Sequence, residues 1–239
     1  MQLVTSKKGN VMHIIPVITI DGPSGCGKGT IAQLLAKKFN WHFLDSGAIY
    51  RAVGWAVLNA KIDPADHVAL RTLIDQVKIE MHASSIGDEA KIVVNNHDIT
   101  NEIRTEACGQ MASITSAIPF VRAALLDRQR AMRQMPGLVT DGRDMGTVVF
   151  PDASLKFYFL ASLEERAKRR FNQLKQKGKH VTLPDILREL QVRDERDSNR
   201  AVAPLKPADN VILIDTTHLN VEGVFEAVFK KATGVFKLP

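Results

Sequence analysis

The sequence has little of several features that define whole classes of protein. Its 239 residues include only two cysteines, Cys26 and Cys108, which form neither a CxxC pair nor a Cys/His zinc pattern. This scarcity argues against a disulfide-stabilised secreted domain and favours a reducing cytoplasm. No apolar segment approaches the ~18 residues that would span a membrane. Residues 1–13 lack an apolar stretch with a cleavage site, so we expect a frayed leader rather than a secretory signal.

Internal repeats and low-complexity tracts are also missing, which excludes solenoids and leaves an ordinary globular chain. Hydrophobic residues make up 45% of the sequence, a share that suits one α/β domain with inserted subdomains. The net charge is +6 and the sequence pI is about 9.4. This balance favours anionic partners, but it does not distinguish nucleotides from nucleic acid or acidic lipid.

The chain is organised around residues 17–35. An apolar, β-rich run, 17–20, ends in a glycine-rich loop, and a helical pattern opens directly after it. A strand, loop and helix in this order predict a phosphate-binding loop for a nucleoside triphosphate such as ATP. The expected binding residues are Gly22, Pro23, Ser24, Gly25, Cys26, Gly27, Lys28, Gly29 and Thr30.

The end of this loop departs from the commonest spacing. Gly27 and Lys28 fall where a phosphate-binding loop places them, but the hydroxyl follows at Thr30 instead of directly after the lysine. A GKGT ending is typical of nucleoside monophosphate kinases rather than GTPases. We expect Lys28 to reach the terminal phosphates and to be catalytic, and Thr30 to contact Mg²⁺ or phosphate. Cys26 sits at a helix start, which predicts either a reactive thiol shielded by ATP or a small loop-filling residue.

Strands and helices alternate at short intervals along the rest of the chain. Strands are predicted at 17–20, 41–45, 138–141, 155–160 and 211–215, and helices from 28 and over 49–58, 63–74, 101–117, 119–135, 162–178, 184–200 and 221–231. This alternation predicts a parallel sheet with helices on both faces. Between the helices, strands at 77–82, 92–94 and 98–99 with turns at 84–88 and 95–96 predict a small inserted antiparallel sheet.

A carboxylate at the end of a core strand predicts the magnesium site. Asp141 ends the strand 138–141, and ligands of open α/β sheets bind at the carboxyl ends of strands. Mg²⁺ keeps several waters and takes one or two carboxylates, so Asp141 is the candidate, with a strand-end cap as the alternative.

Arginines gather where a second phosphate group would bind. Arg51 and Arg143 follow strand ends, and a helical face near the C-terminus carries Arg193, Arg196, Asp197 and Arg200. Guanidinium groups match phosphate oxygens in pairs, although a solvated helix with internal ion pairs is the alternative.

A second basic cluster comprises Arg166, Lys168, Arg169 and Arg170. We expect it to form a lid over the ATP phosphates, with a merely solubilising face as the alternative.

Five separated motifs carry a resemblance over nearly the whole chain from about Pro16. In order they are ITIDGPSGCGKGT, LDSGAIYRA, EIRT, LVTDGRDMGTVVFPDA and RDERDSNRAVAPL. Together they resemble bacterial cytidylate kinases, although Cys26 stands where that family commonly has alanine. The resemblance implies a P-loop kinase fold with a short helical lid, and transfer of the ATP γ-phosphate to CMP or dCMP in pyrimidine metabolism.

The resemblance also implies roles for individual residues. The acceptor nucleotide would be bound by Ser46, Arg51, Ser113, Arg122, Arg143, Asp144, Arg193, Asp197 and Arg200, of which Ser113, Arg122 and Asp144 read the cytosine. Catalytic roles would fall to Lys28, Asp141, Arg143, Arg193 and Arg200, while Arg166 and Arg170 would contact ATP and Thr30 and Asp141 would hold Mg²⁺.

The same resemblance divides the single domain 1–239 into parts. The core comprises 15–45, 105–160 and 200–239, the acceptor-binding part comprises 46–104 with its insert at 77–100, and the lid comprises 161–180. We expect a cytoplasmic monomer with no membrane, nucleic-acid or obligate protein partner.

Three other functions share parts of this pattern. A kinase for UMP, AMP or shikimate would use the same loop. A GTPase switch would need NKxD and DxxG motifs, neither of which is found, and a nucleic-acid-binding protein would need a recognisable binding motif with interleaved aromatics.

Overall fold

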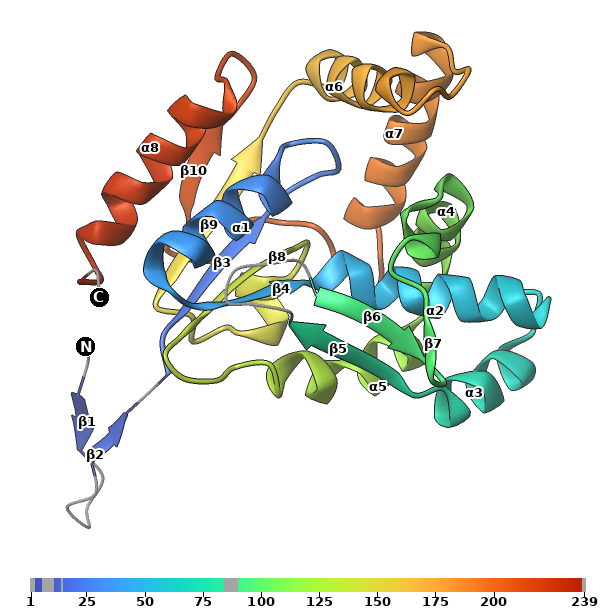
Figure 1. Cartoon of the computed structure of the whole chain (residues 1–239), viewed down its shortest axis with the longest axis horizontal. Helices are drawn as coiled ribbons and strands as arrows, with labels where there is room; N and C mark the ends of the chain where they lie inside the picture. Colours follow the sequence, from blue (N-terminus) through green and yellow to red (C-terminus); the bar gives the residue numbers. More distant parts are fainter. Residues whose placement is uncertain (1–2, 6–10, 14, 84–89, 238–239) are drawn as a thin grey trace.

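Five parallel strands form the central sheet of the computed structural model, which describes residues 3–5, 11–13, 15–83 and 90–237 (Figure 1). Their order across the sheet is β10-β9-β3-β8-β4. The strands are β3 (Val17–Asp21), β4 (His42–Asp45), β8 (Leu138–Gly142), β9 (Leu155–Leu160) and β10 (Ile212–Asp215). The sequence predicts each of them, and the predicted parallel α/β core is confirmed.

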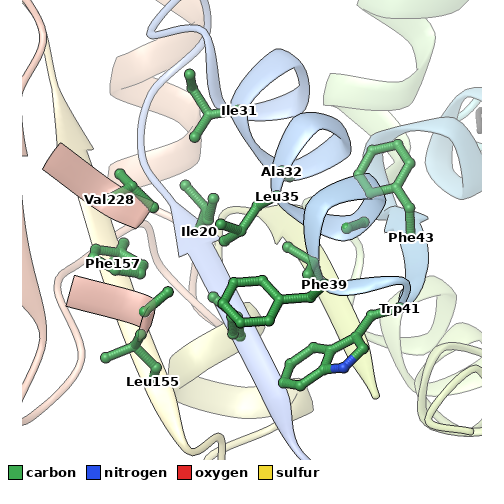
Figure 2. Close-up of a cluster of buried hydrophobic side chains, with 14 of the residues drawn as sticks. Ile20, Ile31, Ala32, Leu35, Phe39, Trp41, Phe43, Leu155, Phe157 and Val228 are labelled. Atoms are coloured by element: carbon green, nitrogen blue, oxygen red, sulfur yellow. The ribbon is translucent and has the colours of Figure 1, made fainter. Parts of the chain in front are cut away.

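Alternate residues of the central strands point to opposite faces and fill two separate apolar clusters. On one face, Ile18 and Ile20 of β3 meet helices α1 (Lys28–Phe39) and α8 (Val221–Thr233). Figure 2 shows this cluster, with Leu35 and Phe39 of α1 close to β3 and Val228 of α8 close to Phe157. Complete burial of a side chain such as Phe157 stabilises the fold by about 1.5–3 kcal/mol.

The opposite face is covered by three helices that pack on Val17, Leu44 and Leu138. These helices are α2 (Ser46–Ala60), α3 (His67–Gln76) and α5 (Pro119–Arg130). A further helix, α4 (Glu106–Thr115), lies along α2. A Cβ atom on Gly54 of α2 would lie only 2.9 Å from backbone atoms of α4. Glycine at this position therefore allows the two helices to approach closely.

A three-stranded antiparallel sheet, β5-β6-β7, is inserted beside α2, as the sequence predicts. Its strands are β5 (Ile79–Ala83), β6 (Ala90–Val94) and β7 (His97–Asp98). The turn at Asn95 and Asn96 is confirmed by their left-handed φ angles of 47° and 68°, whereas the turn predicted at 84–88 lies outside the described residues.

Two helices project from the carboxyl edge of the sheet at the top of Figure 1. They are α6 (Leu163–Gln176) and α7 (Leu183–Ser198), and they share a small apolar cluster of their own. Ser162 accepts a hydrogen bond from the Glu165 N–H at 3.2 Å and so caps the start of α6, near the start predicted for this helix. Within the described residues, no helix is both long and apolar enough to cross a membrane.

Several element ends differ from the prediction for local reasons. The expected helix 119–135 ends at Arg130, where the chain turns so that Arg133 Nε donates to the Ile15 carbonyl at 2.8 Å. The expected helix 101–117 begins at Glu106, because Thr105 caps it by accepting from the Cys108 N–H.

Two further elements were not predicted at all. Residues Met145–Val149 form a π-helical turn directly after β8. At the N-terminus, β1 (Leu3–Thr5) and β2 (Val11–His13) form an antiparallel pair that lies apart from the rest of the chain in Figure 1. For these residues the expectation of a frayed leader is wrong. Val4, Thr5 and Val11 are β-branched, and such residues favour extended backbone.

Candidate active site

The glycine-rich loop between β3 and α1 is held against β9 by a very close backbone contact. A Cβ atom on Gly22 would lie 2.4 Å from the Phe159 carbonyl oxygen, and the φ angle of Gly22 is +146°. Gly25 and Gly27 also have left-handed φ angles, +86° and +82°. These conformations require glycine, and they leave the loop curved around the N-terminus of α1, where backbone N–H groups bind phosphate.

Lys28 opens α1 and is almost completely buried at the bottom of this loop. Its Nζ donates to the Pro23 carbonyl at 2.7 Å, so the loop itself positions the ammonium group. Burial lowers the pKa of Lys28 to about 8, and repulsion by Arg143 adds to the effect. A phosphate group in the loop would restore the charge, which makes Lys28 a suitable partner for a bound triphosphate.

Asp141 fits the predicted magnesium site. It lies beside Asp45 and Ile20 in the sheet register, and its Oδ1 is buried without a hydrogen-bond partner among the described residues. A Cβ atom on Gly29 would lie 3.8 Å from Oδ1, so the carboxylate lies directly beside the start of α1. Burial and the nearby charge of Asp45 raise the pKa of Asp141 to about 8, and a cation would reverse that shift.

Thr30 lines the same cavity as Asp141. The described residues contain no group of three or more acidic, histidine or cysteine side chains that would bind a metal without other ligands. One hydroxyl and one carboxylate are a typical protein contribution to Mg²⁺ coordination, because the ion completes its coordination shell with water and substrate phosphates.

An arginine cluster faces the loop across the cavity. Arg143 Nε donates to Asp197 Oδ2 at 2.9 Å, and Arg200 lies 3.9 Å from Asp197 Oδ1. Arg193, one turn before Asp197 on α7, has its pKa lowered to about 10 by burial and by Arg143, so it remains charged at neutral pH. Three buried N–H groups, Nε of Arg193 and Nε and Nη2 of Arg200, have no hydrogen-bond partner among the described residues. Such groups cost free energy until an anion binds them.

A second buried charge pair lies at the other end of the arginine cluster. Arg122 of α5 forms an ion pair with Asp144 and donates to the Ser116 carbonyl at 3.1 Å. Ser113 of α4 lines the cavity next to them and is only 3% exposed. Donors and acceptors are therefore concentrated here in a buried setting, as a site for a heterocyclic base requires.

Ser46 and Arg51 come from α2. Ser46 Oγ donates to the Asp141 carbonyl at 2.7 Å, and Arg51 donates to the Ile103 carbonyl at 3.3 Å. Both side chains line the cavity, so α2 contributes to the wall between the loop and the inserted sheet.

The arginines of α6 divide between several partners. Arg166 is buried, donates to the Ser24 carbonyl at 3.1 Å and pairs with Asp194 at 2.7 Å, so it supports the loop from behind instead of lining a cavity. Arg170 faces the cavities and pairs with Glu106 of α4. Arg169 bonds Thr216, and Lys168 is exposed. Of this cluster, Arg170 has the position that the lid hypothesis requires.

The hypothesis of a reactive Cys26 thiol is wrong. Cys26 is 2% exposed within the main core cluster, and burial raises the pKa of its thiol. The side chain points into the protein while its backbone follows the loop, so the alternative of a small loop-filling residue is the correct one.

Two connected cavities contain nearly all of the predicted residues. The first, of about 420 Å³, is lined by Ser24, Gly25, Gly27, Lys28, Gly29, Thr30, Ser46, Arg51, Ser113, Arg122, Asp141, Arg143, Asp144, Arg170, Arg193, Asp197 and Arg200. The second, of about 600 Å³, extends from the loop past Cys26 to Leu219 and Val221 at the start of α8. Gly22 and Pro23 of the loop, and Arg166 behind it, line neither cavity.

Sequence reasoning missed Asp21 as a structural support of the site, and it placed Arg196 on the phosphate-binding face, whereas Arg196 lines neither cavity. Asp21, at the end of β3, accepts from the Met145 and Gly146 N–H groups at 2.9 and 2.8 Å and so holds the π-helical turn after β8. Arg196 donates to Ser113 Oγ at 2.8 Å. The position of Asp21 directly before the glycine loop could have marked it as a candidate site residue. Its hydrogen-bond partners could not be found from the sequence, because they lie more than 120 residues away in the chain.

A parallel sheet with a phosphate-binding loop at its carboxyl edge, opposite a cluster of arginines, defines the class of P-loop nucleotide kinases.

Comparison with known proteins narrows this class. The family model for cytidylate kinase matches residues 18–234. A cytidylate kinase of Coxiella burnetii is 54% identical over 89% of this chain and 90% of its own, and that of Stutzerimonas stutzeri is 51% identical over 91% and 95%. A gluconokinase structure from Sinorhizobium meliloti is more distant, with 13% identity, a TM-score of 0.41 and coverage of 93% and 94%. On the sequence relatives alone, the chain belongs to the cytidylate kinase family.

Proposed function

We propose that this chain carries out the reaction of its family, ATP-dependent phosphorylation of CMP and dCMP, with the two nucleotides bound at opposite ends of one cavity. The observation that carries this proposal is the set of buried N–H groups on Arg193 and Arg200, opposite the phosphate-binding loop, for which the described part of the chain supplies no hydrogen-bond partner. Two anion sites facing one another are what transfer between two phosphorylated nucleotides requires.

The donor site is formed by the glycine loop. Its backbone N–H groups and the N-terminus of α1 hold the ATP phosphates, and Lys28 follows the transferring γ-phosphoryl group. The second cavity leads from this loop past Arg170 to Leu219 and Val221, where an adenosine group fits against apolar side chains.

The acceptor site is formed by Arg51, Arg143, Arg193 and Arg200, which hold the CMP phosphate. Asp197 fixes Arg143 at 2.9 Å and faces the sugar side together with Ser46. Ser113, Arg122 and Asp144 contact the cytosine ring.

Thr30 and Asp141 would hold Mg²⁺ between these sites. When bound, the ion supplies positive charge to the donor phosphates and helps to orient them.

Transfer then depends on alignment and charge. An oxygen of the CMP phosphate forms the new bond to the γ-phosphorus while the bond to the bridging oxygen of ADP breaks. Lys28 and the arginine cluster neutralise the charge on the transferring group. No strong base is needed, because the acceptor oxygen is already ionised. Movement of the lid region 161–180, which contains α6, would keep water out of the cavity.

We assign the parts of the chain accordingly. Residues 15–45, 105–160 and 200–239 form the core and 46–104 the acceptor-binding part. Both cysteines are free thiols, which supports a cytoplasmic location, and we expect a monomer without a protein or nucleic-acid partner.

A coupled ADP-release assay with CMP, dCMP, UMP and AMP tests this function. We expect rapid, magnesium-dependent turnover with CMP and dCMP and much slower turnover with AMP. Faster turnover with AMP or UMP than with CMP would overturn the assignment of the acceptor. Absence of ADP release with all four would overturn the reaction itself.

A further inference from the structure

Arg196 of α7 makes a contact that none of the functions assigned above uses. Its Nη1 donates to Ser113 Oγ of α4 at 2.8 Å, and Ser113 is 3% exposed. Ser113 lines the first cavity, whereas Arg196 does not, so the arginine reaches the serine from behind the cavity wall. This bond joins α7, which carries the phosphate-facing Arg193 and ends two residues before Arg200, to the helix that faces the base.

The direction of this hydrogen bond is fixed by chemistry. A guanidinium group has donors and no acceptor, so Ser113 Oγ must be the acceptor. A serine hydroxyl has one proton and two lone pairs, and here one lone pair is occupied by a charged donor. The hydroxyl proton of Ser113 therefore points elsewhere, and the cavity lies beside it. A charged donor also polarises the hydroxyl and makes its proton a stronger donor.

This arrangement distinguishes two pyrimidines. Cytosine has a bare N3 and an O2 on its pairing edge, and both accept hydrogen bonds. Uracil carries a hydrogen on N3, so at that position it needs an acceptor. A serine hydroxyl that is free to rotate serves either base. One that already accepts from a charged guanidinium has a weaker remaining lone pair and a stronger donor proton, so it is a better partner for cytosine than for uracil.

We propose that Arg196 is a positioning residue for base selection, which commits the Ser113 hydroxyl to donate into the cavity and thereby favours CMP over UMP. The proposal rests on the proposed function and adds to it a residue that does not touch the substrate. Arg193 and Asp197 lie on the same helix within one turn, so the helix that binds the phosphate also sets the chemistry at the base.

A double-mutant cycle tests the proposal. Arg196→Met removes the donor and keeps most of the apolar stem. We expect the ratio of kcat/KM for CMP to that for UMP to fall about 10-fold, through a higher KM for CMP, with the KM for ATP unchanged. In a Ser113→Ala background the same substitution should leave the ratio within about 2-fold, because the hydroxyl that it acts on is gone.

Two further variants separate positioning from folding. Arg196→Lys keeps a charged donor and should retain most of the wild-type ratio. Arg188→Met is the matched control on the same helix, because the Arg188 side chain is 75% exposed and forms a 3.4 Å pair with Asp185, a neighbour on its own helix. It should leave the ratio unchanged. If Arg196→Met does not fold, Arg196→Gln replaces it, with an intermediate loss expected because its amide both donates and accepts.

The outcomes are distinguishable. Equal losses for CMP and UMP, or a loss of selectivity that persists in the Ser113→Ala background, would show a structural role for Arg196 and overturn the proposal. An unchanged ratio in Arg196→Met would overturn it as well. In either case a wild-type protein that phosphorylates CMP keeps the proposed function intact, whereas failure of the wild type to use CMP removes both.

Discussion

Arg143 and Asp197 are joined by a hydrogen bond of 2.9 Å that links the loop after β8 to α7. Both are largely buried, and each changes the acidity of the other. Burial alone would raise the pKa of Asp197, but Arg143 and Arg200 lower it below its usual value. Burial likewise opposes the charge on Arg143, and Asp197 outweighs it. The carboxylate therefore holds the guanidinium groups in place while part of their hydrogen-bonding capacity remains free for phosphate.

Arg143→Ala should weaken CMP binding much more than ATP binding. Loss of one charged donor to a phosphate in a buried site is expected to raise the Kd for CMP about 10- to 100-fold, with the Kd for ATP within about 3-fold of wild type. Calorimetric titration with each nucleotide measures both values. Equal weakening of the two nucleotides would argue that Arg143 serves the whole cavity and not the acceptor end.

Lys28→Ala should abolish phosphoryl transfer while leaving the fold intact. Lys28 is placed by the Pro23 carbonyl at the base of the loop, and a transition-state donor of this kind contributes a factor of at least about 100 to turnover. Turnover in the ADP-release assay and the thermal unfolding midpoint are the two readouts. Near-normal turnover would remove Lys28 from the mechanism.

The lowered pKa of Lys28 predicts proton uptake when ATP binds. In the free protein Lys28 loses its charge as the pH rises through about 8. The triphosphate favours the charged amine and raises this pKa, so binding above pH 8 must take up protons and ATP affinity must fall as the pH rises. Titrations in two buffers of different ionisation enthalpy reveal the uptake. A Lys28→Met variant has no amine to protonate at this position, so it should take up fewer protons than the wild type when ATP binds. Equal proton uptake in the two proteins would contradict the assignment.

Asp21 should make the protein less stable as the pH rises from about 4 to about 6. Burial raises its pKa from 3.8 to about 6, despite two backbone hydrogen bonds that oppose the shift. In this window the native state binds more protons than the unfolded state, so the free energy of unfolding falls with pH, by about 3 kcal/mol in all.

The measurement is urea unfolding across this window for the wild type and for Asp21→Asn. The asparagine side chain of the variant cannot ionise. Its amide nitrogen is a donor that would face the N–H of Met145 or Gly146, which is also a donor, so the variant should be less stable than the wild type at every pH in this window. The stability difference between the two proteins should shrink as the pH rises, and a constant difference would refute the assigned pKa.

Both thiols should resist modification in the folded protein. Cys26 and Cys108 are 2% and 3% exposed, and burial raises the pKa of Cys26. A thiol reagent should therefore react slowly in buffer and rapidly in urea, with or without ATP. Fast labelling of native Cys26 that ATP suppresses would restore the hypothesis of an exposed loop thiol.

The core and the loop were predictable because their signals are local. Strands such as β3 and β8 are short apolar runs bounded by glycine or helix caps, and the loop combines glycines with Lys28 in fixed spacing. The inserted sheet was predictable from period-two alternation at 77–82. Arg193 and Asp197 share one face of α7 because they are four residues apart, whereas α7 ends at Ser198, so Arg200 lies beyond the helix that the sequence predicts to extend to 200.

The missed features depend on partners far away in the sequence. The π-helical turn at Met145–Val149 has no local signature, because a carboxylate from β3 accepts its first N–H groups. In the sequence, nothing distinguishes Arg166 from the other basic residues of α6. In the structure, its contacts with Ser24 and Asp194 place it behind the loop. The position of Cys26 at the start of a helix predicts a reactive thiol, but the direction of its side chain depends on the surrounding core, which the local sequence does not show.

The α6–α7 hairpin has an apolar centre separate from the clusters on both faces of the sheet, formed by Ala167, Leu174, Ile186 and Leu190. Its attachments to the remainder of the protein include polar links such as Arg170 with Glu106 and Arg196 with Ser113. A hairpin built in this way would be able to change its angle by exchanging polar partners, without unpacking the apolar clusters on the two faces of the sheet. A nucleotide that binds Arg170 in place of Glu106 would thus act directly on the contact between this hairpin and α4.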